Sequence, residues 1–157
     1  MDEKALRAVV DAVVRQVTES LTLETARRLS ERVREEAARL GVKAVVAVSD
    51  RAGRPILVEC MDDAYIASYD IAVNKAFTVT ALKMSTSELK PLAQPGGSLY
   101  GIQFTNDGKI VIFGGGEPLK VGSRVIGGLG VSGGSEEQDA HLAAFGANAF
   151  ASLVKHA

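Results

Sequence analysis

The stretch from Lys109 to Gly134 constrains the fold more than any other part of the chain, because it contains most of the 16 glycines. Two short apolar runs lie within it, Ile110–Phe113 and Val125–Val131, and each run leads into glycines. Runs rich in β-branched residues and bounded by glycines are typical of strands. We therefore predict that these two runs form an antiparallel hairpin, with residues 117–123 as their connection.

Three consecutive glycines, Gly114, Gly115 and Gly116, leave two interpretations open. A phosphate-binding loop is not favoured, because Glu117 and Pro118 follow them where a helix would have to begin. Glycine does, however, let backbone N–H groups turn outward and lets another backbone or a flat ligand come close. The three glycines are therefore either turn residues only or part of a ligand contact.

A helix is predicted directly after the second glycine cluster, from Ser135 to about Val154. Ser135 suits the N-cap, and Gln138 three residues later completes a capping box. The acidic residues that follow Ser135 are favourable in a first helical turn. We expect this helix to start at the glycine-rich end of the preceding strand.

The composition is that of one soluble domain and excludes several classes of function. Of the 157 residues, 46% are hydrophobic and 24% are charged, with a net charge of −1. Such a balance gives no electrostatic footprint for nucleic acid. No run approaches the length of a membrane span, and the N-terminus is acidic where a signal peptide is basic, so we expect a cytoplasmic protein. The single cysteine, Cys60, excludes an internal disulfide and is predicted to be buried.

Residues 2–19 are predicted to form an amphipathic helix. Their apolar side chains recur at helical spacing, on one stripe, at Leu6, Val9, Val10, Val13, Val14 and Val17. A valine-rich helix of this length is marginal in water, so it must pack on its own domain, on another subunit or on a partner. We therefore divide the chain into an N-terminal helix, residues 1–20, and a domain, residues 21–157.

The remaining pattern predicts an α+β domain in which helices pack on an antiparallel sheet of about five strands. Thr22 suits the N-cap of a second helix. The turn residues Asp50 to Gly53 favour a hairpin between the two strands that flank them. The predicted elements are a helix over Leu23–Leu40, strands over Val42–Ser49 and Pro55–Cys60, a helix from Ser68 or Asp70 to Ala81, a helical turn or loop over Ser87–Pro91, and a strand over Leu99–Thr105.

Several separated motifs resemble the GlcG/HbpS family, which includes the C-terminal domain of PduO-type proteins. They are VAVSDRAGRPILVECMDDAYIASYDIAVNKAFTVTAL, the triple-glycine turn with Pro118 and Leu119, and VIGGLGVSGGSEEQDAHLA, and the similarity covers about residues 21–154. The resemblance implies a sheet-and-helix domain that assembles as dimers and often octamers, with haem bound by several members. PduO itself joins this domain to a cobalamin adenosyltransferase domain, which is missing here.

The first 20 residues resemble the short amphipathic peptides that direct enzymes into bacterial microcompartments. That resemblance implies a shell protein as partner of residues 1–20, and the compartment lumen as the location. Such a helix would lay its apolar stripe into a groove of the shell protein.

Lys75 is the most informative polar residue of these motifs, because it lies on an apolar helix face beside Ala72 and Ala76. A buried lysine needs a partner, and Asp50 or Asp139 can supply it. One hypothesis is a pocket between this helix and the glycine turn, in which Lys75 binds a propionate or another carboxylate. The other is a structural ion pair or a lysine that reaches solvent. The candidate ligand-binding set is Lys75, Asp50, Gly114, Gly115, Gly116, Gln138 and Asp139.

Haem iron takes His, Met, Cys or Tyr as its axial ligand. His141, near the start of the last helix, is the candidate metal ligand, and a second histidine, His156, lies near the C-terminus. Further candidates are Cys60, Met61, Tyr65, Tyr69 and Met84. The family motifs do not require histidine at position 141.

The sequence therefore predicts an oligomeric accessory protein that binds haem or another tetrapyrrole and is associated with a microcompartment. The alternative is an enzyme acting on a small organic acid or aldehyde, with Lys75 and Asp139 in a subunit-interface pocket. A third hypothesis is an assembly protein whose oligomer clusters other cargo.

Overall fold

The computed structural model describes residues 2–18 and 20–155, with only the backbone described at 15–18 and 155. The helices and strands are α1 (Glu3–Thr18), α2 (Leu23–Arg39), β1 (Val45–Asp50), β2 (Pro55–Cys60), α3 (Ile66–Leu82), α4 (Thr86–Leu92), the short 3-10 helices η1 (Ile102–Phe104) and η2 (Asn106–Gly108), β3 (Gly116–Val121), β4 (Arg124–Ser132) and α5 (Glu136–Lys155).

The sheet has the strand order β2-β1-β4-β3, and every neighbouring pair is antiparallel. Val45 at the start of β1 lies opposite Cys60 on β2 and Ser132 on β4. The predicted α+β class is therefore confirmed, although the described residues form four strands instead of about five. The turn at Asp50 is also confirmed, since its Oδ1 accepts the N–H groups of Ala52 and Arg54.

The predicted hairpin is wrong in its first strand. Residues 110–113 form no strand and run beside α3, where the Val111 N–H donates to Thr78 Oγ1 at 3.0 Å. The hairpin partner of β4 is β3, which occupies most of the predicted connection. Pro118 misled the prediction, because it suggests a turn but is also tolerated on an edge strand such as β3.

A strand predicted over Leu99–Thr105 is also wrong. This segment forms turns and η1, and η2 follows it. Asn106 and Asp107 have positive φ angles, which bend the chain away from an extended course. The predicted helical turn or loop at Ser87–Pro91 is the helix α4, whose capping box joins Ser85 and Glu88.

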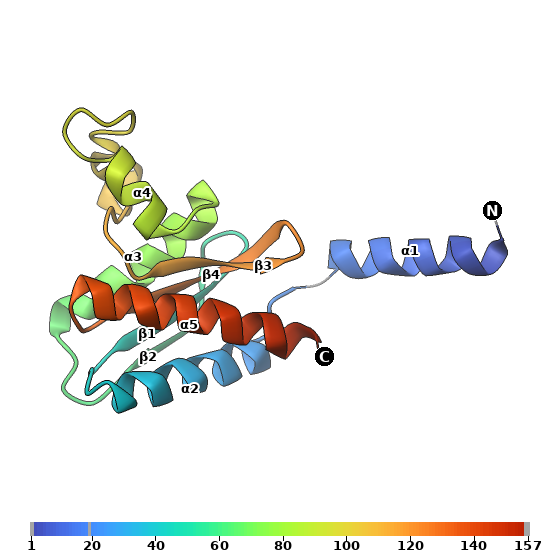
Figure 1. The fold of residues 1–157 in the computed structure, drawn as a ribbon, viewed down its shortest axis with the longest axis horizontal. Helices are drawn as coiled ribbons and strands as arrows, with labels where there is room; N and C mark the ends of the chain where they lie inside the picture. Colours follow the sequence, from blue (N-terminus) through green and yellow to red (C-terminus); the bar gives the residue numbers. More distant parts are fainter. Residues whose placement is uncertain (1, 19, 156–157) are drawn as a thin grey trace.

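Three layers are visible in Figure 1: α3 lies on one face of the sheet, and α2 and α5 lie on the other. The core between the sheet and the α2–α5 pair is aliphatic and includes Leu29, Val33, Val46, Val48, Leu129 and Leu142. On the opposite face, β4 presents Gly128 and Gly130 to α3. A Cβ atom at either position would collide with a carbonyl oxygen of α3, that of Ala76 or Ala72 respectively. These strand glycines therefore permit close packing of α3 on the sheet.

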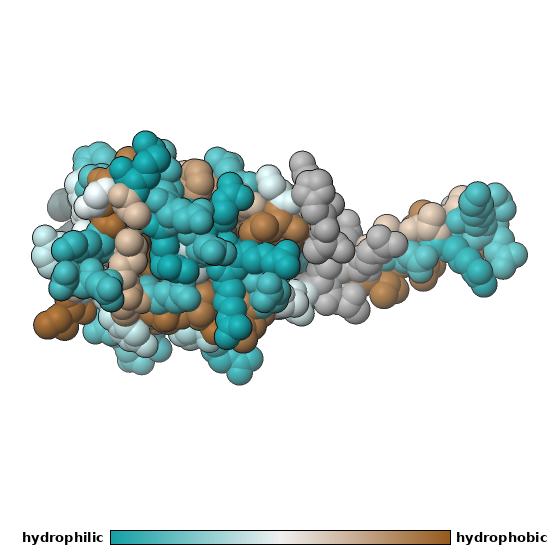
Figure 2. Space-filling view, turned by 90° about the horizontal axis from the view of Figure 1, so that it is seen from below, coloured by the Kyte–Doolittle hydropathy of each residue, from teal (hydrophilic) through white to brown (hydrophobic). Residues whose placement is uncertain are grey.

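The helix α1 extends away from the body of the molecule (Figure 1). Leu6, Val9, Val10 and Val13 are each about half exposed, and Figure 2 shows hydrophobic residues along this segment. The helix predicted for residues 2–19 is confirmed over Glu3–Thr18, while the side chain of Val17 lies outside the described part. No helix among the described residues combines the length and the hydropathy of a membrane span.

Candidate functional site

The fully buried Lys75 lies at the centre of the candidate site. Its Nζ donates to the carbonyl oxygen of Val131 at 2.8 Å and to Asp139 Oδ2 at 3.3 Å. The same ammonium lies 4.9 Å from the centre of the Phe113 ring, within range of a cation–π interaction. Of the two predicted partners, Asp139 is the one that the fold brings to Lys75.

Burial acts against the charges of both partners. It lowers the pKa of Lys75, and the negative charge of Asp139 opposes that shift. Burial likewise raises the pKa of Asp139, while Lys75 and the Gly134 N–H, which donates to Oδ1 at 2.9 Å, oppose the rise. Each group thus favours the charged form of the other. The pair ties α3 to the start of α5.

Gly115 closes the site over the ammonium. Its φ is +116°, a region that side chains disfavour, and its carbonyl oxygen accepts the Val131 N–H at 2.8 Å. A Cβ atom at this position would lie 2.5 Å from Lys75 Nζ and 2.6 Å from the Val131 carbonyl oxygen. Glycine is therefore required here by close approach as well as by backbone conformation.

The two neighbouring glycines are held by side chains from other elements. The Gly114 N–H donates to Glu136 Oε1 at 3.0 Å, and the Gly116 N–H donates to Thr86 Oγ1 at 2.9 Å. Lys90 donates to the other Glu136 oxygen at 2.6 Å. The hydrogen bond from Gly114, followed by the one from Lys90, lowers the pKa of the Glu136 carboxyl. The triple-glycine turn is thus fixed to α4 and α5.

Two hollows lie on either side of Gly133 and Gly134. The smaller, of about 260 Å³, has Asp139 and Phe113 in its wall. The larger, of about 510 Å³, is bordered by Lys43 and other residues around the start of α5. Both are bordered by Gly133, Gly134 and Tyr65. Neither Lys75 nor the triple-glycine turn lines either hollow, so the ligand contacts predicted for them remain predictions.

Asp50 lies away from this site. The register of the sheet places Asp50 opposite Gly127 and Val45 opposite Ser132, so Asp50 is at the far end of β1. Its carboxylate serves the β1–β2 turn and contacts Arg54 at 3.5 Å. Its predicted role as a ligand contact stays a prediction, and such a contact would lie apart from Lys75 and Asp139.

Gln138 completes the predicted capping box, because its Oε1 accepts the Ser135 N–H at 2.9 Å and its own N–H donates to Ser135 Oγ. It also borders the larger hollow. His141 follows Asp139 by two residues, which turns its side chain about 200° around the helix. Its Nε2 lies 2.9 Å from Glu36 Oε1 on α2, and half of its side chain is exposed.

Glu36 also accepts two hydrogen bonds from Arg39. The hydrogen bonds from Arg39 and then His141 lower the pKa of the Glu36 carboxyl to about 2. This cluster links α2 to α5, and none of its three residues lines either hollow. Within residues 2–18 and 20–155, no three His, Cys, Asp or Glu side chains are grouped so that they could hold a metal ion; His156 lies outside the described residues.

Several residues of the site gave little or no sequence signal for their role. Phe113 was assigned to a strand, Glu136 was recognised only as a helix-start residue, and Tyr65 only as one of several alternative haem ligands. Thr86 gave no signal at all, because its partner Gly116 is 30 residues away. The prediction that Cys60 is buried is wrong, since it lies exposed at the end of the edge strand β2.

A family model described as haem-degrading protein HbpS-like matches residues 21–148. A 15.0 kDa protein of the dhaT-dhaS intergenic region of Citrobacter freundii is 43% identical over 85% of this chain and 94% of its own length. The corrinoid adenosyltransferase PduO of the same organism is 37% identical over 90% of this chain. The match spans only 42% of that relative.

Two solved structures resemble the fold closely. The Klebsiella pneumoniae protein ORFY has a TM-score of 0.83 and 42% identity, over 85% of this chain and 92% of that one. A PduOC:haem complex has a TM-score of 0.80 and 39% identity, over 83% of this chain and 95% of that one. The helix α1 precedes the residues matched by the family model.

Proposed function

Since the chain belongs to the HbpS-like family of haem-degrading proteins, we propose that it is an accessory protein that binds haem or a related tetrapyrrole. The observation that carries this proposal is the similarity to the PduOC:haem complex, which extends over most of the chain. The corrinoid adenosyltransferase activity of PduO is not proposed, because the chain spans less than half of that protein.

The two hollows combine aromatic and apolar surface, which can contact a flat macrocycle, with polar and charged side chains. Tyr65 and Phe113 supply aromatic surface, and Ile71 lines the smaller hollow. Lys43 beside the larger one pairs with Asp63 at 3.3 Å and would exchange that carboxylate for a propionate. Tyr65 also carries a phenol, one of the side chains that hold haem iron. When bound, haem supplies an iron centre for redox and oxygen chemistry. The site thus contains groups for the macrocycle, for its carboxylates and for the iron.

In a single copy of the chain, the two hollows are too small to enclose such a ligand, so part of its surface would be exposed to solvent. The smaller hollow is below the range of about 300–1,000 Å³ that is usual for ligand pockets, and the larger one lies in the lower half of that range. We therefore include in the proposal a homo-oligomer, a dimer or an octamer, whose second copy covers the exposed face of the ligand.

An absorption titration of the purified protein with haemin tests the proposal. A stoichiometric shift of the Soret band is expected. Tyr65→Phe changes the position of that band if the phenol holds the iron, whereas His141→Ala changes it if the sequence-based candidate does. Tyr100→Phe removes an exposed phenol far along the chain, on the segment before η1, and serves as the control. Titrations without any Soret shift, together with no affinity for cobalamins, would contradict tetrapyrrole binding.

We further propose that α1 binds a shell protein and places the chain in the lumen of a bacterial microcompartment. The exposed apolar stripe supports this, because an amphipathic helix can lie in a groove of a partner. Co-purification with shell proteins should depend on residues 1–20. Val13→Asp should abolish it, whereas Ala8→Asp adds the same charge on the opposite side of the helix and should leave it intact. Equal retention of both variants would contradict the proposal.

The enzymatic alternative requires Lys75 to reach a substrate in a subunit-interface pocket. Lys75 is fully buried, both of its hydrogen bonds are internal, and it lines neither hollow. No contact among the described residues therefore favours this alternative over binding.

A further inference from the structure

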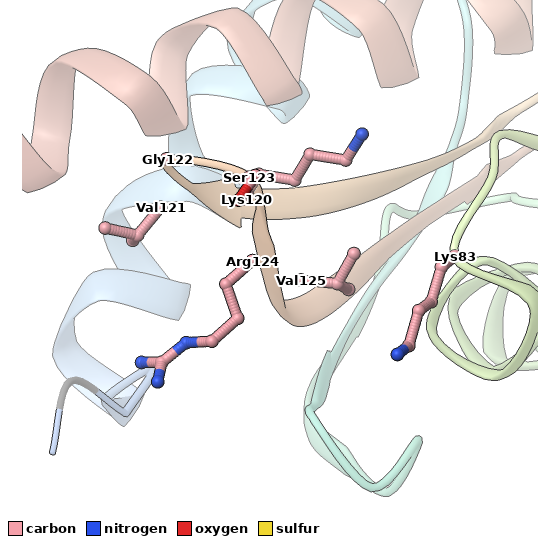
Figure 3. A pocket seen from close by; sticks show the side chains of 7 residues that line it. All are labelled: Lys83, Lys120, Val121, Gly122, Ser123, Arg124 and Val125. Carbon is pink, nitrogen blue, oxygen red and sulfur yellow. The ribbon is translucent and has the colours of Figure 1, made fainter. Parts of the chain in front are cut away.

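A third cavity, of about 480 Å³, lies at the other end of β4, around the turn that joins β3 and β4 (Figure 3). Three of the described residues that line it are cationic, Lys83, Lys120 and Arg124, and no described residue of the lining is acidic. Ser123 adds a hydroxyl, and Val121 and Val125 add apolar surface. The lining thus combines positive charge with a short apolar wall.

Lys83 and Arg124 have no acidic partner in a salt bridge among the described residues, whereas the charge of Lys120 acts on the nearby Glu117 carboxyl. No salt bridge in the described part of the chain involves any of the three, and the ion pairs at the surface are made by other residues. One guanidinium nitrogen of Arg124, Nη2, is buried and lacks a hydrogen-bond acceptor. A buried charged donor without an acceptor is uncommon, and a bound anion is one of the ordinary explanations. Arg124 is therefore the strongest indication of a ligand.

The cations do not converge on one point. In Figure 3, Arg124 and Lys83 reach downward on either side of Val125, and the amine of Lys120 lies above the hairpin. A single small ion therefore cannot contact all three, whereas a ligand with two separated anionic groups can bridge Arg124 and Lys83. Guanidinium groups bind carboxylates and phosphates through two parallel hydrogen bonds, and an ammonium binds either as a point charge.

We propose that this cavity binds a small organic anion with two separated anionic groups, held by Arg124 at one end and Lys83 at the other. The site is separate from the proposed haem site, since Ser132 borders the latter and Arg124 begins the same strand eight residues earlier. Lys83 is the C-cap of α3 and Arg124 begins β4, so the two charges are held by different elements of the fold.

Calorimetric titration of the full chain at low ionic strength tests the proposal, with pyrophosphate and succinate as probes. We expect saturable binding of at least one probe and much weaker binding of acetate. Each substitution, Arg124→Gln or Lys83→Gln, should weaken binding about tenfold, which is the usual loss for one charge-assisted hydrogen bond. Arg27→Gln removes an exposed charge on α2 and should change the affinity less than about twofold.

The relative affinities assign the chemistry of the ligand: tighter binding of pyrophosphate indicates phosphate groups, and tighter binding of succinate indicates carboxylates. Arg124→Lys keeps the charge but loses the planar fork, so it should bind more weakly than the unmodified chain. The Lys83 variant carries the test if the Arg124 variants do not fold. The proposal is overturned if neither probe saturates, or if Arg27→Gln weakens binding as much as Arg124→Gln.

Discussion

Replacing Gly115 by alanine should be one of the most destabilising single-methyl additions in this fold. The backbone contributes first, because a φ of +116° is strained for any residue with a Cβ atom and costs about 1–3 kcal/mol. The added methyl contributes next, since it would lie 2.5 Å from Lys75 Nζ and 2.6 Å from the Val131 carbonyl oxygen. Overpacking of this kind costs a further 1–3 kcal/mol or so. The expected total is therefore about 2–6 kcal/mol.

Gly101→Ala is the matched control. Gly101 also has a positive φ, +93°, but no atom lies within 4 Å of a Cβ atom built there. The control therefore carries the backbone cost alone, and the two variants should differ by about 1–3 kcal/mol in free energy of unfolding. With a urea m-value of about 1–3 kcal/mol/M, that difference separates the two unfolding midpoints by roughly 1 M.

Far-UV circular dichroism at increasing urea concentrations measures both midpoints. Two variants with the same midpoint would refute the reasoning, because Gly115 would then not be needed for the close approach of the glycine turn to Lys75. The m-values of the two variants should also be compared. A Gly115 variant with a different m-value from the Gly101 variant would indicate that its folded or unfolded state has changed, in addition to its stability.

Two further predictions concern charges. Lys75→Met leaves the buried Asp139 without its counter-ion and should destabilise the fold by about 3–5 kcal/mol in urea unfolding, and the double variant with Asp139→Asn should recover most of that loss; a double variant no more stable than the single one would contradict the pairing. Glu36 has a folded pKa of about 2, below its usual 4.5, so it stabilises the fold above pH 4.5 and loses that contribution as the pH falls toward 2. Glu36→Gln should therefore flatten the acid limb of a stability profile measured between pH 2 and 6, and an unchanged limb would show that Arg39 and His141 do not act through Glu36.

The parts of the fold that were predicted correctly rest on signals between residues close in sequence. Thr22 caps α2 and Ser135 precedes α5, each within three or four residues of its hydrogen-bond partner. The Asp50 turn likewise joins residues two and four positions apart. Because the partners of such interactions are only a few residues apart, their spacing in the sequence is enough to predict them.

The errors occurred where contacts distant in sequence decide the structure. An apolar run of four residues at Ile110–Phe113 fits a strand as well as a packed irregular segment, and only its position beside α3 decides between them. Lys75 was recognised as a lysine in need of a partner, but Asp139 lies 64 residues away and Asp50 is nearer in sequence. The periodicity of one helix cannot choose between them, because the choice is made by the strand order of the sheet.

The glycines of residues 109–134 show how one sequence feature serves separate physical needs. Gly128 and Gly130 let α3 approach β4, and Gly115 lets a turn lie directly over the Lys75 ammonium. Of the glycines in this stretch, Gly133 and Gly134 are the ones that border the two hollows proposed to bind a flat ligand. Glycines needed for a turn and glycines beside a ligand site look the same in the sequence. Only the residues that contact them in the fold distinguish the two roles. Variants made to test tetrapyrrole binding should therefore change residues at the junction of β4 and α5, where Gly133 and Gly134 lie beside the aromatic ring of Tyr65 in the lining of both hollows.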